Sequence, residues 1–181
     1  MNYSFIKEAD GVYYTNSTLP LIDTYTIAFL KESALKSKLK RARLCLHLHK
    51  TDIQHDMVIV VHRDSYVAPH RHLSQSETFI LIEGNVNLLV FEENGDINNV
   101  INMKSFDNHD NNTFFYRMSK NIFHSLSLNS EFVVFIESTL GPFDLTQREH
   151  ASWAPNHNDF NFGLKFIKNI VEKNNTLNNL K

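Results

Sequence analysis

The chain has 181 residues, 42% of them hydrophobic, and a formal net charge of -2 at pH 7. A chain of this length and apolar content can form one domain with a hydrophobic core, and it is too short for two. Because the charge balance shows no basic excess, neither nucleic acid nor an anionic membrane is expected as a partner.

No apolar run approaches the roughly 18 residues that a membrane-spanning helix needs, so no membrane insertion is expected. The first residues, MNYSF, lack the basic and apolar regions of a secretory signal. The single cysteine, Cys45, has no partner for an internal disulfide, which agrees with a reducing compartment. We therefore expect a cytoplasmic protein.

One amphipathic helix is predicted over residues 21–40, behind an N-cap at Asp23 or Thr24. Its apolar positions recur at near-helical spacing: Ile22, Ile27, Leu30, Ala34 and Leu35. The basic residues after it are interpreted as a complement to the helix dipole rather than as an anion site: Lys38, Lys40, Arg41 and Arg43. Residues 1–41 are thus expected to be an N-terminal extension that carries this helix.

From residue 42 to about 139 the hydrophobic period falls to two, and β-branched and aromatic residues accumulate. The clearest hairpin signal is Glu93-Asn94-Gly95-Asp96. Many short strands without intervening helices predict an antiparallel barrel or sandwich, assigned to residues 42–155. The chain is expected to be irregular after Gly141 and Pro142. Residues 156–181 are predicted to hold a final helix, FGLKFIKNIVEKN, and a frayed tail.

The stretch APHRHLSQSETFILIEGNV, residues 68–86, has the spacing of a metal site. Side chains two apart on a strand point to the same face, so His70 and His72 can reach one ion at about 2.1 Å. Glu77, at the start of the next strand, can return to that ion, and Gly84 supplies the turn at its end.

A fourth ligand has to come from a distant strand, and His124 is the natural candidate. Three neutral imidazoles and a carboxylate suit zinc, iron, manganese, nickel or cobalt, and spacing does not choose among them. An isolated HxH pair is more often the polar face of a strand. The added glutamate, glycine and distant histidine favour the metal site.

His70-x-His72, Glu77 and Gly84 resemble the first cupin motif, and His124 stands where the second motif places its histidine. Over residues 22–155 the chain is similar to the WbuC-like cupin metalloproteins of bacterial O-antigen and surface-polysaccharide gene clusters. The segments that carry this similarity are RARLCLH, YVAPHRH, SETFILIEG, LLVFEENG, FYRM, GPFD and WAP.

The resemblance implies a mainly β fold: one cupin double-stranded β-helix barrel of jelly-roll type, here with an N-terminal and a C-terminal helix. It also implies one divalent transition metal held by His70, His72, Glu77 and His124, and a homodimer. Cupins have glycine where this chain has Asp64, and proline and glycine where it has Ser119 and Asn121. Asparagine tolerates a left-handed backbone, so the turn before His124 is expected to survive.

Three further residues are candidates for a catalytic role. Arg43 and His47 could line the barrel mouth, where an arginine can hold a carboxylate or phosphate bidentately. Tyr116 could donate a proton or hydrogen bond near the ion, or be an ordinary buried tyrosine.

Other reactive side chains are given structural roles. Cys45 is interpreted as a small buried hydrophobe and His49 as part of a polar strand face. Trp153 and Phe143 are expected to cap the core rather than to cover the pocket. The remaining histidines are expected to be solvated: His55, His62, His109, His150 and His157.

Three functions fit these observations. The first is a metal-dependent isomerase or epimerase for a sugar or sugar nucleotide, with the link to polysaccharide synthesis taken from the resemblance. The second is an iron-dependent dioxygenase, and the third a non-catalytic cupin that binds a metal or sugar. No helix-turn-helix segment accompanies the predicted barrel, so binding to nucleic acid is not expected.

Overall fold

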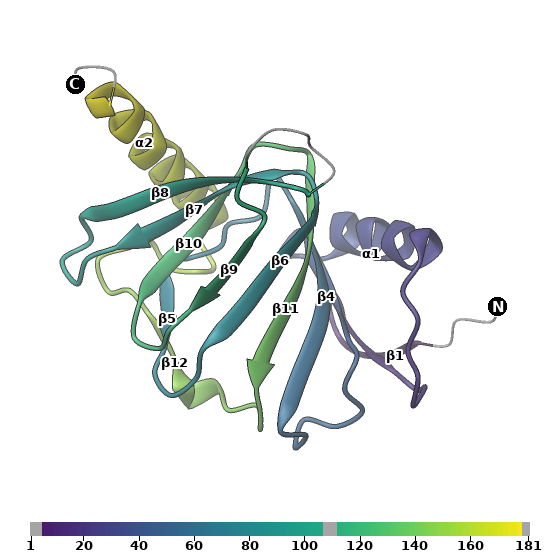
Figure 1. Ribbon diagram of the computed structural model, residues 1–181. Helices are drawn as coiled ribbons and strands as arrows, with labels where there is room; N and C mark the ends of the chain where they lie inside the picture. Colours follow the sequence, from purple (N-terminus) through teal and green to yellow (C-terminus); the bar gives the residue numbers. More distant parts are fainter. Residues whose placement is uncertain (1–4, 107–111, 179–181) are drawn as a thin grey trace.

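Two β-sheets face each other in the computed structural model, which describes residues 5–106 and 112–178 (Figure 1). The larger sheet has the order β1-β2-β3-β4-β11-β6-β9, formed by Phe5–Ala9, Val12–Thr15, Arg41–Cys45, Gln54–His62, Phe132–Leu140, Glu77–Glu83 and Phe115–Met118. The smaller has the order β12-β5-β10-β7-β8, formed by Arg148–His150, His70–His72, Phe123–Leu128, Asn85–Phe91 and Ile97–Lys104. Neighbouring strands run antiparallel, except that β2 and β3 are parallel.

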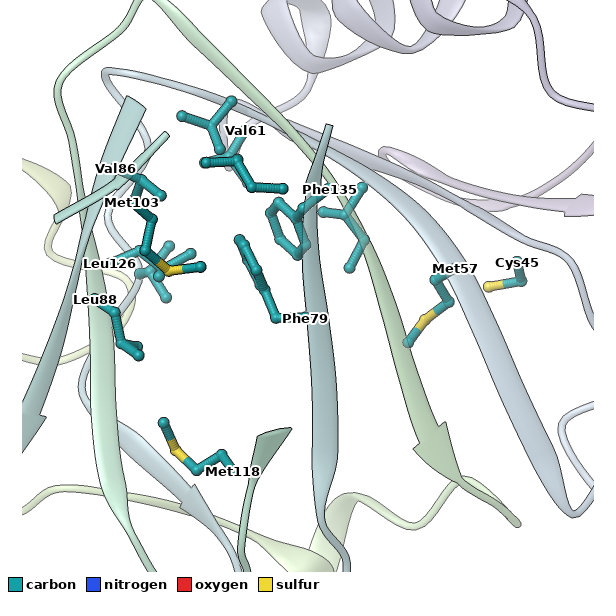
Figure 2. Close-up of a cluster of buried hydrophobic side chains, with 14 residues drawn as sticks. Cys45, Met57, Val61, Phe79, Val86, Leu88, Met103, Met118, Leu126 and Phe135 are labelled. Atoms are coloured by element: carbon teal, nitrogen blue, oxygen red, sulfur yellow. The ribbon is translucent and has the colours of Figure 1, made fainter. Parts of the chain in front are cut away.

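The inward side chains of the two sheets form the main hydrophobic core. Figure 2 shows Leu88 and Leu126 of the smaller sheet facing Phe79 and Phe135 of the larger one. The rings of Phe79 and Phe135 stack with their centroids 4.2 Å apart. Every second residue of a strand points inward, so period-two sequences bury one face here. The predicted fold class is confirmed: a mainly β, double-stranded β-helix barrel of jelly-roll type with two flanking helices.

Helix α1 spans Thr24–Lys36 and packs on the outer face of the larger sheet. Asp23 is its N-cap, as predicted, and its side chain accepts a hydrogen bond from the Thr26 amide over 2.9 Å. The helix ends four residues before the predicted residue 40, because Ser37 is extended and its hydroxyl bonds the Ala34 and Arg41 carbonyls. Arg41 and Arg43 therefore belong to β3. Their interpretation as a complement to the helix dipole is wrong.

Strands β1 and β2 were not expected from the sequence. They form a hairpin around Gly11, whose φ is 69°, and β2 pairs with β3 in the larger sheet. Part of the expected N-terminal extension thus continues the sheet. The domain boundaries at residues 41 and 155 stay a prediction.

Helix α2 spans Phe160–Asn178 and packs through Ile167 against an outer cluster that includes Tyr66, Phe123 and Trp153. Trp153 caps this cluster, as expected. The segment between Pro142 and α2, expected to be irregular, holds a 3-10 helix over Leu145–Gln147 and β12. Within the described part of the chain, neither helix is long and apolar enough to cross a membrane.

Three turns agree with the sequence interpretation. Gly95 has a φ of 91° in the predicted hairpin between β7 and β8, and Gly84 has a φ of 96° between β6 and β7. A Cβ on Gly84 would lie 2.5 Å from the Phe132 carbonyl oxygen. Asn121 has a φ of 65°, and its amide donates to the His72 carbonyl over 2.8 Å. The turn before His124 is thereby joined to β5.

Candidate metal centre

Three histidines of the smaller sheet meet at its inner face. His70 and His72 lie on β5, and His124 lies on the adjacent strand β10, directly opposite His70. The ring of His124 has its centroid 4.5 Å from that of His70 and 5.9 Å from that of His72. One nitrogen from each ring lies within 4.8 Å of the others, a separation at which three ligands can hold one metal ion.

The backbone sets which nitrogen the rings of His70 and His124 present. The Nδ1 atom of His70 lies 2.9 Å from the Ala68 carbonyl oxygen, and that of His124 lies 2.9 Å from the Ile122 carbonyl oxygen. An Nδ1–H donated to each carbonyl leaves the Nε2 lone pair free. This orienting hydrogen bond is typical of histidines that ligate metals.

The Glu77 carboxylate, at the start of β6, reaches these rings from the opposite sheet. Its Oε2 lies 3.1 Å from His72 Nε2, and its Oε1 lies 3.2 Å from His124 Nε2. Tyr116 on β9 donates its hydroxyl hydrogen to Oε1 over 2.9 Å. Three imidazole nitrogens and a carboxylate oriented by a tyrosine fit a divalent transition metal.

Burial and charge give these groups different pKa values. Burial lowers the pKa of His70 well below its usual value, and Arg148 and His124 add to this effect. Burial would also lower the pKa of His124, but the charge and hydrogen bond of Glu77 raise it. Burial would raise the pKa of Glu77, yet His124 and His72 hold it well below its usual value. Glu77 is therefore an ionised carboxylate at neutral pH, the form that binds metals.

A cavity of about 280 Å³ lies beside the four residues. Its walls are part apolar, with Phe79 and Phe135 among them, and part charged, with Arg41, Arg43, Arg148 and Glu137. Burial and the charge of Glu77 raise the pKa of Glu137, whereas Arg43 opposes that shift. The cavity thus combines a possible metal site, a carboxyl group that can carry a proton, and cationic groups.

The structure brings most of the predicted site residues together. His70, His72, Glu77, His124 and two of the three catalytic candidates, Arg43 and Tyr116, line the cavity. The third, His47, does not line it. Its buried ring stacks on His55, with centroids 3.8 Å apart.

Two of the histidines expected to be solvated are buried. His55 and His62 on β4 are 4% and 9% exposed, so that expectation is wrong for them. His55 shares the inward face of β4 with Met57, Ile59 and Val61, and strand alternation could have indicated this. His49, His150 and His157 are exposed, and His109 lies outside the described residues. Cys45 is buried, as expected, and burial raises its pKa.

Sequence reasoning missed three cavity residues: Arg41, Glu137 and Arg148. Two of them had a usable signal, because Arg41 shares the face of β3 with Arg43, and Glu137 follows Val133 and Phe135 at period two. Arg148 had none. It enters the site because β12 pairs with β5 and places it opposite His72.

One family model and several solved structures are similar to parts of this chain. A family model described as a domain of unknown function (DUF6016) matches residues 22–103, and no curated protein matches the chain by sequence. A similar solved structure is an uncharacterized double-stranded β-helix protein of Klebsiella pneumoniae, with 15% identity, a TM-score of 0.46, and coverage of 61% of this chain and 79% of that one.

Two other similar structures are an oxalate decarboxylase and a seed globulin. The decarboxylase of Bacillus subtilis has 14% identity and a TM-score of 0.45, over 61% of this chain and 27% of its own. The 11S globulin procruciferin of Brassica napus has 12% identity and a TM-score of 0.43, over 54% of this chain and 23% of its own. The chain thus spans about a quarter of the length of each. Together, its fold and site define a double-stranded β-helix protein with a histidine cluster that can hold a metal.

Proposed function

We propose that this chain is a metal-dependent enzyme that holds one divalent transition metal through His70, His72, Glu77 and His124. The observation that carries the proposal is the convergence of three histidine nitrogens within 4.8 Å of one another. The Glu77 carboxylate contacts two of these rings and supplies the negative charge that a divalent cation requires.

The reaction we propose is isomerisation or epimerisation of a sugar or sugar nucleotide in bacterial surface-polysaccharide synthesis. When bound, a divalent cation at this site polarises a carbonyl oxygen of the substrate and acidifies the adjoining C–H bond. Glu137 lines the same cavity and has a raised pKa, so its carboxylate can take up that proton and return it to a neighbouring atom. A carboxyl group in the cavity favours proton transfer over oxygen chemistry.

Metal content tests the ligand set. Untagged protein, measured by inductively coupled plasma mass spectrometry, should contain close to one equivalent of one transition metal. His72→Ala should lose this metal. His49→Ala, which removes an exposed histidine outside the site, should keep it. Equal metal content in His72→Ala and the native chain would reject the proposed ligands.

Deuterium incorporation tests the reaction class. The protein is incubated in D2O with sugar phosphates and sugar nucleotides, and the recovered compounds are analysed by mass spectrometry. Isomerisation or epimerisation by proton transfer should place deuterium on carbon, and Glu137→Gln should abolish this while retaining metal. Oxygen consumption with an oxidised product would instead indicate an oxygenase. Compounds that bind but return without deuterium would indicate a binding protein.

A cytoplasmic homodimer completes the proposal and is supported by the family resemblance in the sequence. Light scattering during size-exclusion chromatography gives the mass directly. Twice the mass of the chain is expected, and a single-chain mass at micromolar concentration would contradict it.

A further inference from the structure

Three arginines converge on the cavity beside the candidate metal centre. Arg41 and Arg43 are two residues apart on β3 and therefore project from the same face of the larger sheet. Arg148 comes from the smaller sheet, where it pairs with His72. All three line the cavity that His72 and Glu77 also line.

These guanidinium groups lack protein partners. Among the described residues, none of the three makes a side-chain hydrogen bond or ion pair, and the Nε atoms of Arg43 and Arg148 are buried without an acceptor. The nearby Arg71 differs: it contacts Glu149 at 2.9 Å and Glu93 at 2.6 Å. A buried donor without an acceptor is destabilising, so Arg43 and Arg148 are arranged for a group that this chain does not provide.

Guanidinium groups carry a positive charge at neutral pH. Burial, with the charges of Arg148 and Arg43, lowers the pKa of Arg41 to about 10, which still leaves it protonated. The cavity also has three carboxyl groups. Asp10 lies at the exposed rim, where it accepts from the Lys38 amide, and Glu77 is held by the histidines. Glu137 interacts electrostatically with all three arginines and Glu77 with Arg148, while a bound divalent cation would add two positive charges.

We propose that Arg41, Arg43 and Arg148 form an oxyanion subsite that holds the carboxylate or phosphate of a small substrate. Guanidinium groups pair bidentately with both oxyanions, and three of them can surround one such group. This proposal rests on the proposed function, in which the reacting end of the substrate lies toward His72 and Glu77. It deepens that function by defining the substrate as an acid or phosphate ester.

The cavity size narrows the substrate further. A volume of about 280 Å³ lies near the lower end of the roughly 300–1,000 Å³ found for small-molecule sites. A sugar acid or sugar phosphate suits this space. A sugar nucleotide adds a base, a ribose and a second phosphate, which would have to lie outside the cavity.

Calorimetric titration tests the subsite. The probes are inorganic phosphate, glucose 6-phosphate, gluconate and uncharged glucose, added to the protein as purified and after removal of metal by a chelator. We expect binding of the two phosphate compounds, of gluconate, or of all three. Glucose should not bind. Arg43→Met and Arg148→Met should each weaken binding by about tenfold or more. Arg63→Met, which removes an exposed arginine that does not line this cavity, is the matched control.

Metal content and thermal unfolding separate the alternatives. Arg43→Met removes a cation whose buried Nε has no acceptor, so it should keep its metal and unfold at an unchanged or higher temperature. Arg43→Lys should bind the oxyanion with intermediate affinity. If the chain takes up no metal but binds oxyanions through these arginines, the proposed function is refuted and the subsite is retained. If metal content is normal and the arginine variants bind oxyanions as the native chain does, the subsite is refuted. Normal metal content without any oxyanion binding would refute it as well.

Discussion

The Tyr116 hydroxyl and the Glu77 carboxylate are joined by a hydrogen bond of 2.9 Å. Glu77 Oε1, the atom that accepts it, also lies 3.2 Å from His124 Nε2. Tyr116 is itself held by its stack on Phe79, with ring centroids 4.9 Å apart. A tyrosine on β9 therefore orients the carboxylate that reaches the histidines on the opposite sheet.

Tyr116→Phe should weaken metal binding about 10- to 100-fold without abolishing it, because the carboxylate loses an orienting partner and remains a ligand. Competition with a chromogenic chelator measures the affinity. Tyr66→Phe is the control, since the Tyr66 hydroxyl donates to the Pro155 carbonyl in the outer cluster. Equal affinities in both variants and the native chain would show that Tyr116 does not position Glu77.

Asn121 should be replaceable by glycine but not by valine. Its φ of 65° suits glycine, whereas a β-branched side chain there is strained by about 1–2 kcal/mol. Asn121→Val should therefore be less stable in urea than Asn121→Gly by about that amount, and should bind metal more weakly through displacement of His124. Both variants keep the amide that bonds His72. Equal stability of the two would contradict a role for the left-handed turn.

The stacked His47 and His55 pair should make the fold sensitive to acid. Burial and the neighbouring His55 lower the pKa of His47, so the folded state resists its protonation while the unfolded chain does not. This contribution to stability is complete above the unfolded pKa of about 6.5 and is lost as pH falls toward the lower folded value.

His47→Phe should therefore reduce the loss of urea stability between pH 7 and pH 5, with metal removed. His70 and His150 also have lowered pKa values, so part of the loss remains. His49→Phe, at an exposed position, should leave the pH dependence unchanged. An identical pH dependence in His47→Phe and the native chain would reject this account.

Leu30→Ala should destabilise the fold by about 2–5 kcal/mol, because a buried leucine leaves a cavity when it is truncated. Leu30 is fully buried between α1 and the outer face of the larger sheet. Leu35→Ala on the same helix, 44% exposed, should cost less than about 1 kcal/mol. Urea unfolding followed by circular dichroism compares the two, and similar losses would show that α1 does not depend on this contact.

The local part of the site could be predicted from the sequence. His70 and His72 lie two residues apart on β5, so strand alternation alone places them on one inner face, and the short loop after β5 leads to Glu77 on the facing sheet. The Asp23 cap and the left-handed backbone of Gly84 and Asn121 are local features, and each has the expected contact or conformation. Local backbone preferences and period-two alternation determine such features, because they act between near neighbours.

The tertiary structure decided which distant residues share the cavity. His124 was placed from the sequence by its motif, and its position opposite His70 depends on the pairing of β10 with β5. Arg148 comes from a segment without strand periodicity and reaches the site because β12 completes the edge of β5. Arg41 on β3 lines the cavity, whereas His47, two residues beyond the end of β3, stacks on His55. The register between strands far apart in sequence is determined by backbone hydrogen bonds and core packing over the whole barrel, which no short stretch of residues specifies.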